Sequence, residues 1–275
     1  MNIFDAIKND DLESMVEANP SVVNTSAPLK PVETNNLIAP PTLSKSNTKR
    51  GSIPSDDINF SPAALEKMRT ASRHICYLIN EGYNLKMAYT FVGNHFALSE
   101  RQRLAIARSI ATTSQIKNRK SKEKTNISGD EVWIDGFNTI ITLEVLCSNS
   151  LLFLNMDGTI CDLASLRGRY RIIPETEKAV NLLFETLSDM KVSSVHILLD
   201  EPVSNSGRLK TLIAEISEKY QFVVDIKLIK AVDKALYGKD DVITSDSIIL
   251  DNCKSWVNLV ANCLIKSNVM TLKVW

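Results

Sequence analysis

The sequence predicts an α/β fold, in which a parallel sheet with helices on both faces is preceded by a small all-α helical domain. Across residues 59–125 the apolar side chains recur at helical spacing, whereas from residue 130 onward short apolar runs alternate with amphipathic stretches. Alternation of this kind is typical of strands joined by helices in a parallel sheet. With 275 residues, 44% of them hydrophobic, the chain can bury one large core and a smaller one.

The first 58 residues are predicted to contribute little to either core. Residues 1–20 contain a short helical segment that resembles the first helices of an ankyrin repeat, although no second copy follows. A lone repeat cannot bury its apolar face by stacking, so the segment is either a docking site for a protein partner or a poorly ordered tail. Residues 21–58 are rich in Pro, Ser, Thr and Asn and are predicted to form a disordered linker.

A helical domain of three or four helices is predicted at residues 59–125. Ser61-Pro62 opens its first helix, with the serine as N-cap and the proline at the first helical position. A second helix is predicted over 85–92, ending near Gly93. A third is predicted over 99–110, after which the chain becomes strongly basic.

The α/β domain is predicted at residues 130–275. Two apolar runs, 151–156 and 159–163, predict a hairpin that turns at Asp157-Gly158. The predicted strands of the sheet are 132–134, 194–199, 222–228 and 242–244, with 270–274 as a further candidate. The predicted helices are 139–147, 176–189 and 207–220. In such a sheet, loops and ligands gather at the carboxyl ends of the strands.

Aspartates stand at those strand ends. Asp135, Asp200 and Asp246 each follow or close a predicted strand, and Asp233 precedes the last of these strands on a predicted short helix. Taken singly, each of these aspartates is explained as a helix cap or a turn residue. Taken together, converging carboxylates would repel one another unless a cation lay among them. Since hard divalent cations prefer oxygen ligands, the set predicts a site for Mg²⁺ or Mn²⁺.

Two further groups of side chains have the chemistry to contact phosphate. The loop after Asp200 contributes Ser204, Asn205, Ser206 and Arg208 just before a predicted helix, where hydroxyls, amides and the helix amino terminus can bind an anion. Ser206 is equally explained as an N-cap. A basic stripe in the helical domain comprises Arg101, Arg103, Arg108, Lys117, Arg119, Lys120, Lys122 and Lys124. It is suited to non-specific nucleic-acid contact, or it is a solvated helix face.

The segment Ile134-Asp135-Gly136-Phe137-Asn138, with strand-end Asp200 and the terminal Thr244-Ser245-Asp246, resembles the PIN-like and NYN nuclease superfamily. That resemblance implies metal-dependent cleavage of RNA or single-stranded nucleic acid. It implies that Asp135, Asp200, Asp233 and Asp246 are the catalytic acids, that Asp135, Asp200 and Asp246 bind the metal, and that Asn138 orients Asp135. Asn138 and Ser245 would also face the substrate. The chain departs from the superfamily pattern by the insertion of residues 151–170, and the match of Asp233 is open.

A longer pattern resembles the bacterial and archaeal family catalogued as domain of unknown function four-three-four, from about Phe60 to the carboxyl terminus. Five segments carry this resemblance: Phe91 to His95, Leu98 to Arg108, Ile134 to Ile141, Leu199 to Gly207, and Thr244 to Asp246. The resemblance implies no particular activity.

Several function classes find no support in the sequence. Basic and acidic residues both number 32, so no net charge draws the protein toward nucleic acid or membrane. The chain has neither a secretory signal pattern nor an apolar run near the length of a membrane span, and we expect it to be cytoplasmic. Asn155-Met156-Asp157-Gly158-Thr159 resembles a haloacid-dehalogenase loop, but Asn155 cannot serve as its carboxylate nucleophile.

Two functions therefore remain from the sequence. The first is a Mg²⁺- or Mn²⁺-dependent nuclease that hydrolyses phosphodiesters of RNA or single-stranded nucleic acid, with metal-activated water as the nucleophile. The second is a non-catalytic nucleic-acid-binding or regulatory protein that keeps the fold and binds through its basic helices. The sequence does not decide between them.

Overall fold

The structure is a computed structural model that describes residues 49–164, 169–267 and 269–275. The predicted helical segment at residues 1–20 and the linker as far as residue 48 lie outside these described residues. The described residues all belong to one unit of the chain, Thr48–Trp275. None of the helices in this described part combines the length and the apolar character that a membrane crossing requires.

The helical region begins where the sequence predicts it. Its helices are α2 (Asp56–Asn59), α3 (Pro62–Asn80), α4 (Leu85–His95), α5 (Glu100–Ser109) and α6 (Thr113–Lys122). The Ser61 side chain caps α3 by accepting from the Ala64 backbone N–H, as the Ser-Pro pair predicts. The second predicted helix forms as α4 and ends at His95, one residue beyond the predicted stop near Gly93-Asn94, so Gly93 does not terminate it. The glycine has a packing role instead, since a Cβ there would collide with the guanidinium of Arg103.

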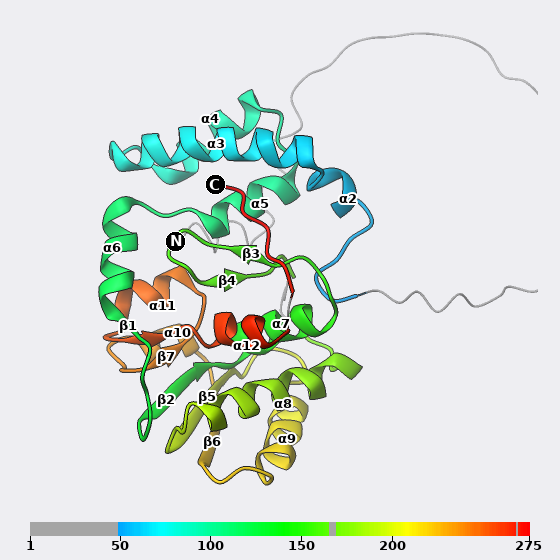
Figure 1. Ribbon diagram of the computed structural model, residues 1–275, viewed down its shortest axis with the longest axis vertical. Coiled ribbons are helices and arrows are strands. Elements are labelled where there is room, and N and C mark those ends of the chain that lie inside the picture. Colours follow the sequence, from blue (N-terminus) through cyan, green and yellow to red (C-terminus); the bar gives the residue numbers. More distant parts are fainter. Residues whose placement is uncertain (1–48, 165–168, 268) are drawn as a thin grey trace, which may run out of the picture. The chain divides into compact units, whose positions relative to one another are not determined.

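A parallel six-stranded sheet forms the centre of the α/β region (Figure 1). Its strands are β1 (Glu123–Lys124), β2 (Glu131–Asp135), β5 (Ser194–Asp200), β6 (Val223–Ile229), β7 (Val242–Ile243) and β8 (Trp256–Val257). They are arranged in the order β1-β8-β7-β2-β5-β6. The predicted strand at residues 270–274 is wrong, because only Leu272 forms an isolated bridge there, with Phe153.

Helices cover the sheet on both faces, and the alternation of strand residues explains why. In β5, Val195 and Ile197 point into a core built with α7 (Gly136–Cys147), α8 (Pro174–Asp189), α9 (Ser206–Ser217) and α12 (Leu259–Ser267). Leu198 points to the opposite face, into a smaller core with α10 (Val232–Leu236) and α11 (Ser247–Asn252). Successive strand side chains face opposite ways, so a strand that is buried on both faces is apolar throughout.

The predicted hairpin forms from β3 (Phe153–Leu154) and β4 (Ile160–Cys161), which pair antiparallel. It packs against the helical region, because Phe153, Cys161 and Val274 lie in the same buried cluster as α3, α4 and α5. The Ser72 hydroxyl donates to the Val274 carbonyl at 2.7 Å. The helical region and the last residues of the chain thus share one core.

Composition predicts a disordered linker as far as residue 58, yet residues 49–58 contact both regions. The Arg50 guanidinium lies 2.6 Å from the buried carboxylate of Glu144 on α7. Asp56 is ion-paired with Arg101 of α5 at 2.8 Å. These partners lie about 45 to 94 positions away along the chain, so local composition gave no sign of them.

Candidate metal centre and its surroundings

The four predicted acids lie at or just beyond the ends of two adjacent strands, at the start of α11 and on a short helix. Asp135 is the last residue of β2 and Asp200 is the last residue of β5, its parallel neighbour. On the other side of β2, strand β7 ends at Ile243 and leads to Asp246, the N-cap of α11. Asp233 lies in the first turn of α10. We call these four residues the acidic rim.

Asp135 is the member of the acidic rim that the other three carboxylates influence electrostatically. The Asp135 side chain is buried, with 6% of its residue surface exposed. Burial raises the pKa of Asp135 well above its ordinary value, and the nearby carboxylates of Asp246, Asp233 and Asp200 raise it further, in that order. A hydrogen bond from Thr244 opposes this shift. The structure therefore brings the other three predicted acids within electrostatic reach of Asp135.

A small hydrogen-bond network fixes the β7 end of the rim. The Thr244 hydroxyl donates to Asp135 Oδ2 at 2.9 Å and accepts from the Asp246 backbone N–H at 3.0 Å. Asn138 Oδ1 accepts from the backbone N–H and the hydroxyl of Ser245, at 2.9 and 3.0 Å. Asn138, predicted to orient Asp135, thus holds the loop whose threonine reaches Asp135.

The Asp-Gly pair at the end of β2 has a steric basis. A Cβ at Gly136 would lie 2.6 Å from Leu199 Cδ2 and 2.7 Å from the Leu198 carbonyl oxygen. Only glycine lets the chain turn from β2 into α7 so close to β5. This contact sets Asp135 beside the end of β5 and contributes to the burial of its carboxyl group.

Asp246 has one oxygen committed to the backbone. Its Oδ1 accepts from the N–H groups of Ile248 at 2.8 Å and Ile249 at 3.3 Å, which is the capping role that the sequence allowed for each aspartate. A capping carboxylate keeps its second oxygen for another ligand. Capping and cation binding are therefore compatible at this residue.

Tyr237 is a neighbour of the rim that sequence reasoning missed. It follows α10 directly, and its residue surface is 38% exposed. Burial raises the pKa of its phenol, and the carboxylates of Asp233 and Asp246 raise it further. The one available signal was spacing, since Tyr237 lies four residues after Asp233 and so on the same side of a helical turn.

Polar side chains of the loop after β5 form hydrogen bonds to the backbone of the same chain. Ser204 Oγ accepts from the Tyr170 backbone N–H at 3.0 Å, and Asn205 Nδ2 donates to the Tyr170 carbonyl at 2.6 Å. Arg208 is exposed. The N-cap of α9 is Asn205 in a left-handed conformation (φ 63°), so Ser206 as N-cap is wrong by one residue; Ser206 is buried and donates to the Glu201 carbonyl at 3.4 Å.

The basic stripe is largely occupied by contacts inside the protein. Arg119 is buried between Asp157 and Asp251, at 2.8 and 2.7 Å. Lys122 Nζ donates to three carbonyls at the end of α11, those of Leu250, Asp251 and Cys253. Arg101, Arg103, Arg108 and Lys124 also bind acceptors of this chain. Lys117 and Lys120 remain exposed on α6.

No ready-made metal cage is present in the part of the chain that the structure describes. There, no group of three or more His, Cys, Asp or Glu side chains is placed to hold a metal ion together. Mg²⁺ often uses only one or two protein carboxylates and keeps several waters, so a full cage is not required for it. The carboxylates of the acidic rim are the type of ligand that such a site, with few protein ligands and several waters, requires.

Comparison with known sequences gives the chain a family. The profile described as "Domain of unknown function (DUF5616)" matches residues 124–262, from β1 into α12. A second profile, "Protein of unknown function (DUF434)", matches residues 67–122 in the helical region. The chain belongs to the DUF5616 family. The resemblance predicted from Phe60 to the carboxyl terminus is thus divided between two profiles, one for each region.

Uncharacterized protein MJ0935 of Methanocaldococcus jannaschii is 36% identical over 192 residues, which cover 68% of this chain and 92% of that protein. No solved structure matches the chain. Both profiles are described as of unknown function, and this archaeal relative is described as uncharacterized.

Proposed function

We propose that the acidic rim binds Mg²⁺ or Mn²⁺ and that this DUF5616 protein is a metal-dependent nuclease of the PIN-like kind, which hydrolyses phosphodiesters of RNA or single-stranded nucleic acid. One observation supports the proposal above all others. The buried carboxyl group of Asp135 is surrounded by three further carboxylates that each raise its pKa. A cation at this position would remove that repulsion.

The donor chemistry of the rim fits a hard divalent ion. Asp135 and Asp246 would hold the ion, since both supply carboxylate oxygens and the Thr244 hydroxyl links the Asp135 carboxylate to the Asp246 backbone N–H. Asp200 and Asp233 would complete the negative environment, directly or through water. The parallel sheet with acids at the carboxyl ends of adjacent strands supports the PIN-like assignment.

A bound ion would supply Lewis acidity, polarising a phosphate and lowering the pKa of a water. The protein's own part is positioning. Thr244 fixes one oxygen of Asp135, and Asn138 fixes the loop that carries Thr244 and Asp246. Tyr237, half-exposed beside Asp233, offers a ring on which a base of a single strand can stack.

The test combines metal binding with cleavage. Mn²⁺ binding is measured by titration calorimetry, and cleavage is measured on a panel of single-stranded RNAs and DNAs. The double variant Asp135→Asn, Asp246→Asn should lose both, whereas Asp57→Asn, an exposed acid on α2, should keep both. Metal-dependent cleavage that is absent from the double variant supports the nuclease.

Two other outcomes are informative. In the first, the chain binds single-stranded nucleic acid without cleaving it, with equal affinity in the double variant. That result would contradict the nuclease and support the non-catalytic binding function. Mn²⁺ binding that survives in the double variant would move the metal away from the acidic rim and contradict the proposed site.

A further inference from the structure

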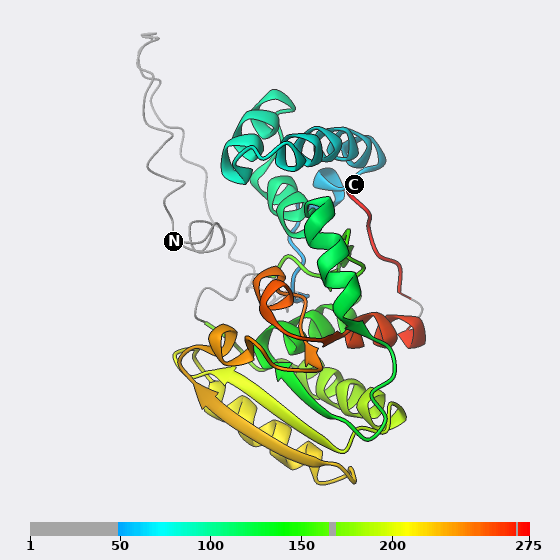
Figure 2. The ribbon, with the colours of Figure 1, turned by 90° about the vertical axis from the view of Figure 1, so that its left-hand side faces the viewer.

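The outer edge of β6 is the longest open edge of the sheet. Strand β6 has seven residues and ends the strand order, whereas β1 at the opposite end has two. Within the described residues, no strand pairs with the side of β6 that faces away from β5, and β6 forms the margin of the sheet in Figure 2. An edge of this length presents a row of backbone donors and acceptors to any strand that can align with it.

The hydrogen bonds at the two ends of β6 show which residues face outward. The Val223 N–H donates to the Ser193 carbonyl at 3.4 Å, and the Ile229 carbonyl accepts from the Glu201 N–H at 2.9 Å, both toward β5. Backbone groups of successive strand residues point to alternate sides. Val224, Ile226 and Leu228 therefore direct their N–H and C=O groups to the open edge.

The side chains of β6 are arranged symmetrically about Ile226. The sequence Val-Val-Asp-Ile-Lys-Leu-Ile has two apolar residues at each end and one charge on each side of the centre, negative at Asp225 and positive at Lys227. Reversal of the strand exchanges the two charges and keeps the apolar pattern. The strand is therefore complementary to an antiparallel copy of itself.

We propose that two copies of this protein associate through their β6 strands, antiparallel and centred on Ile226. In this register Ile226 faces its own copy, Val224 faces Leu228 of the second copy, and Asp225 faces Lys227 of the second copy. The outward-facing backbone groups then coincide with the hydrogen-bonded pairs, so register and hydrogen bonding agree. The interface is isologous, as a two-fold axis requires.

The exposed surface of β6 agrees with pairing. Val223 is 70% exposed, an unusual state for a large apolar strand residue, and in the dimer it would lie opposite Ile229 of the second copy. The Asp225 and Lys227 side chains are 40% and 56% exposed and lie on one face, 2.9 Å apart. In the dimer these two side chains and their copies would form a four-charge cluster across the new strand pair.

Charges on an edge strand can also serve to prevent pairing. An edge strand that carries charges of only one sign prevents pairing with its own copy, because like charges then face one another in every symmetric register. In β6 a negative and a positive residue flank the central Ile226. In the symmetric register each therefore faces the opposite charge of the second copy, and the two strands attract each other. This arrangement favours a second copy of the chain as the partner.

The experiment is sedimentation velocity of the full chain from about 1 to 100 µM, a range that covers micromolar association. The unaltered chain should dimerise. Lys227→Asp and Asp225→Lys should each weaken association at least about tenfold, because both facing pairs become like-charged. An equal mixture of these two variants should dimerise again, since its facing pairs are once more opposite.

Lys86→Asp, the same charge change at an exposed lysine of α4, should leave association unchanged. Hydrogen exchange provides a second measurement: amides of residues 222–230 should exchange more slowly as the concentration of the chain rises. A chain that stays monomeric over the whole range, or a dimer unaffected by both β6 charge changes and by mixing, would overturn the proposal.

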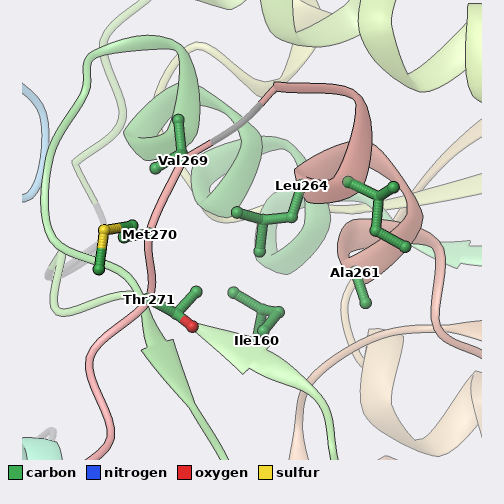
Figure 3. Close-up of a pocket in the computed structure, with 7 residues that line it drawn as sticks. Ile160, Ala261, Leu264, Val269, Met270 and Thr271 are labelled. Atoms are coloured by element: carbon green, nitrogen blue, oxygen red, sulfur yellow. The ribbon is translucent and has the colours of Figure 1, made fainter.

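A second candidate surface carries no proposal. A cleft of about 340 Å³ lies between α12, the hairpin and the carboxyl-terminal segment, lined largely by apolar side chains that include Leu264, Val269 and Met270 (Figure 3). Ile265 and Met270 at its margin are 81% and 90% exposed. Nothing in the structure identifies what would cover this cleft.

Discussion

The acidic rim and the basic stripe are two groups of charged side chains that the sequence suggests as functional. They differ in whether those charges are paired within the chain. In the stripe, six of the eight cations bind carboxylates or carbonyls of the same chain: Arg101, Arg103, Arg108, Arg119, Lys122 and Lys124. In the rim, burial raises the pKa of Asp135, and its acidic neighbours raise it further. Most cations of the stripe are thus paired within the chain, whereas Asp135 is held among like charges at an electrostatic cost.

This difference shows how to distinguish a charge used for folding from a charge kept for a ligand. A buried ion pair is expensive to break, because removal of one partner leaves the other charge buried without compensation. A cluster of like charges has the opposite property, since removal of one charge relieves the others. Substitutions in the two regions should therefore change stability in opposite directions.

The largest effect is expected at Arg119. Arg119→Met leaves Asp157 without its cation while keeping most of the buried side-chain volume, and should lower the free energy of unfolding by about 3–5 kcal/mol. Chemical denaturation followed by circular dichroism measures the loss. Lys117→Met on the exposed side of the same helix is the matched control. A loss at Arg119 no larger than that of the control would show that the stripe is not structural.

Thr244 is expected to come next. Thr244→Val removes the hydroxyl between Asp135 and Asp246, and should cost about 1–3 kcal/mol because buried polar groups lose their partner. Thr244→Ser keeps the hydroxyl and should recover most of that stability. The hydrogen bond lowers the pKa of Asp135, so its loss should raise that pKa still further. Failure of serine to recover stability would assign the effect to the methyl group.

Asp135→Asn should raise stability in metal-free buffer. The pKa of Asp135 in the folded chain lies above its ordinary value of 3.8, so its contribution to stability is largest below pH 3.8 and falls as the pH rises through the folded-state pKa. The variant should therefore exceed the unaltered chain by more than about 0.5 kcal/mol at pH 8, and the gap should close toward pH 4.

Chemical denaturation at several pH values, with a chelator present, measures this difference. Added Mn²⁺ should then stabilise the unaltered chain and not the variant, by mass action. A variant that is less stable than the unaltered chain at pH 8 would indicate a compensating partner for Asp135 and would remove the reason for a cation.

The smallest effect on stability is expected at the exposed end of the stripe. The double variant Lys117→Ala, Lys120→Ala should change the free energy of unfolding by less than about 0.5 kcal/mol. If the stripe contacts single-stranded RNA, affinity should fall and the slope of log K against log salt should decrease by about 1 to 2. Unchanged affinity and slope would leave the stripe without a role in binding.

Much of the sheet was predictable, because its central strands are buried on both faces and read as short apolar runs. The central strands around Val132, Val195 and Val242 were predicted on this basis, and the edge strand around Val224 was predicted from its branched apolar residues despite its two charges. Strands β1 and β8 were not, since two residues carry no periodicity and Glu123 and Lys124 are charged. The strand predicted at 270–274 was apolar for another reason: Leu272 and Val274 pack against the hairpin and α3.

The gathering of the acids was predictable as far as topology decides it. Parallel strands end at one rim, so Asp200 and Asp246 were expected at the same edge of the sheet as Asp135 once the strands were recognised. The roles of Thr244 and Tyr237 depended on side-chain packing between separate elements, which no local pattern encodes. The same limit applied to the stripe, where the partners of Arg119 lie 38 and 132 positions away.

The contact of Val274 with the helical core has a consequence for synthesis of the protein. The hydrogen bond from Ser72 to Val274 spans 202 positions, and the Arg69 guanidinium reaches the Lys273 carbonyl across 204. At ordinary elongation rates, about 10 to 40 seconds pass between translation of the α3 residues and translation of the carboxyl-terminal residues that they contact. Throughout that interval the nascent helices expose the apolar surface that Val274 will cover, so this core cannot be completed until the residues around Val274 have been translated.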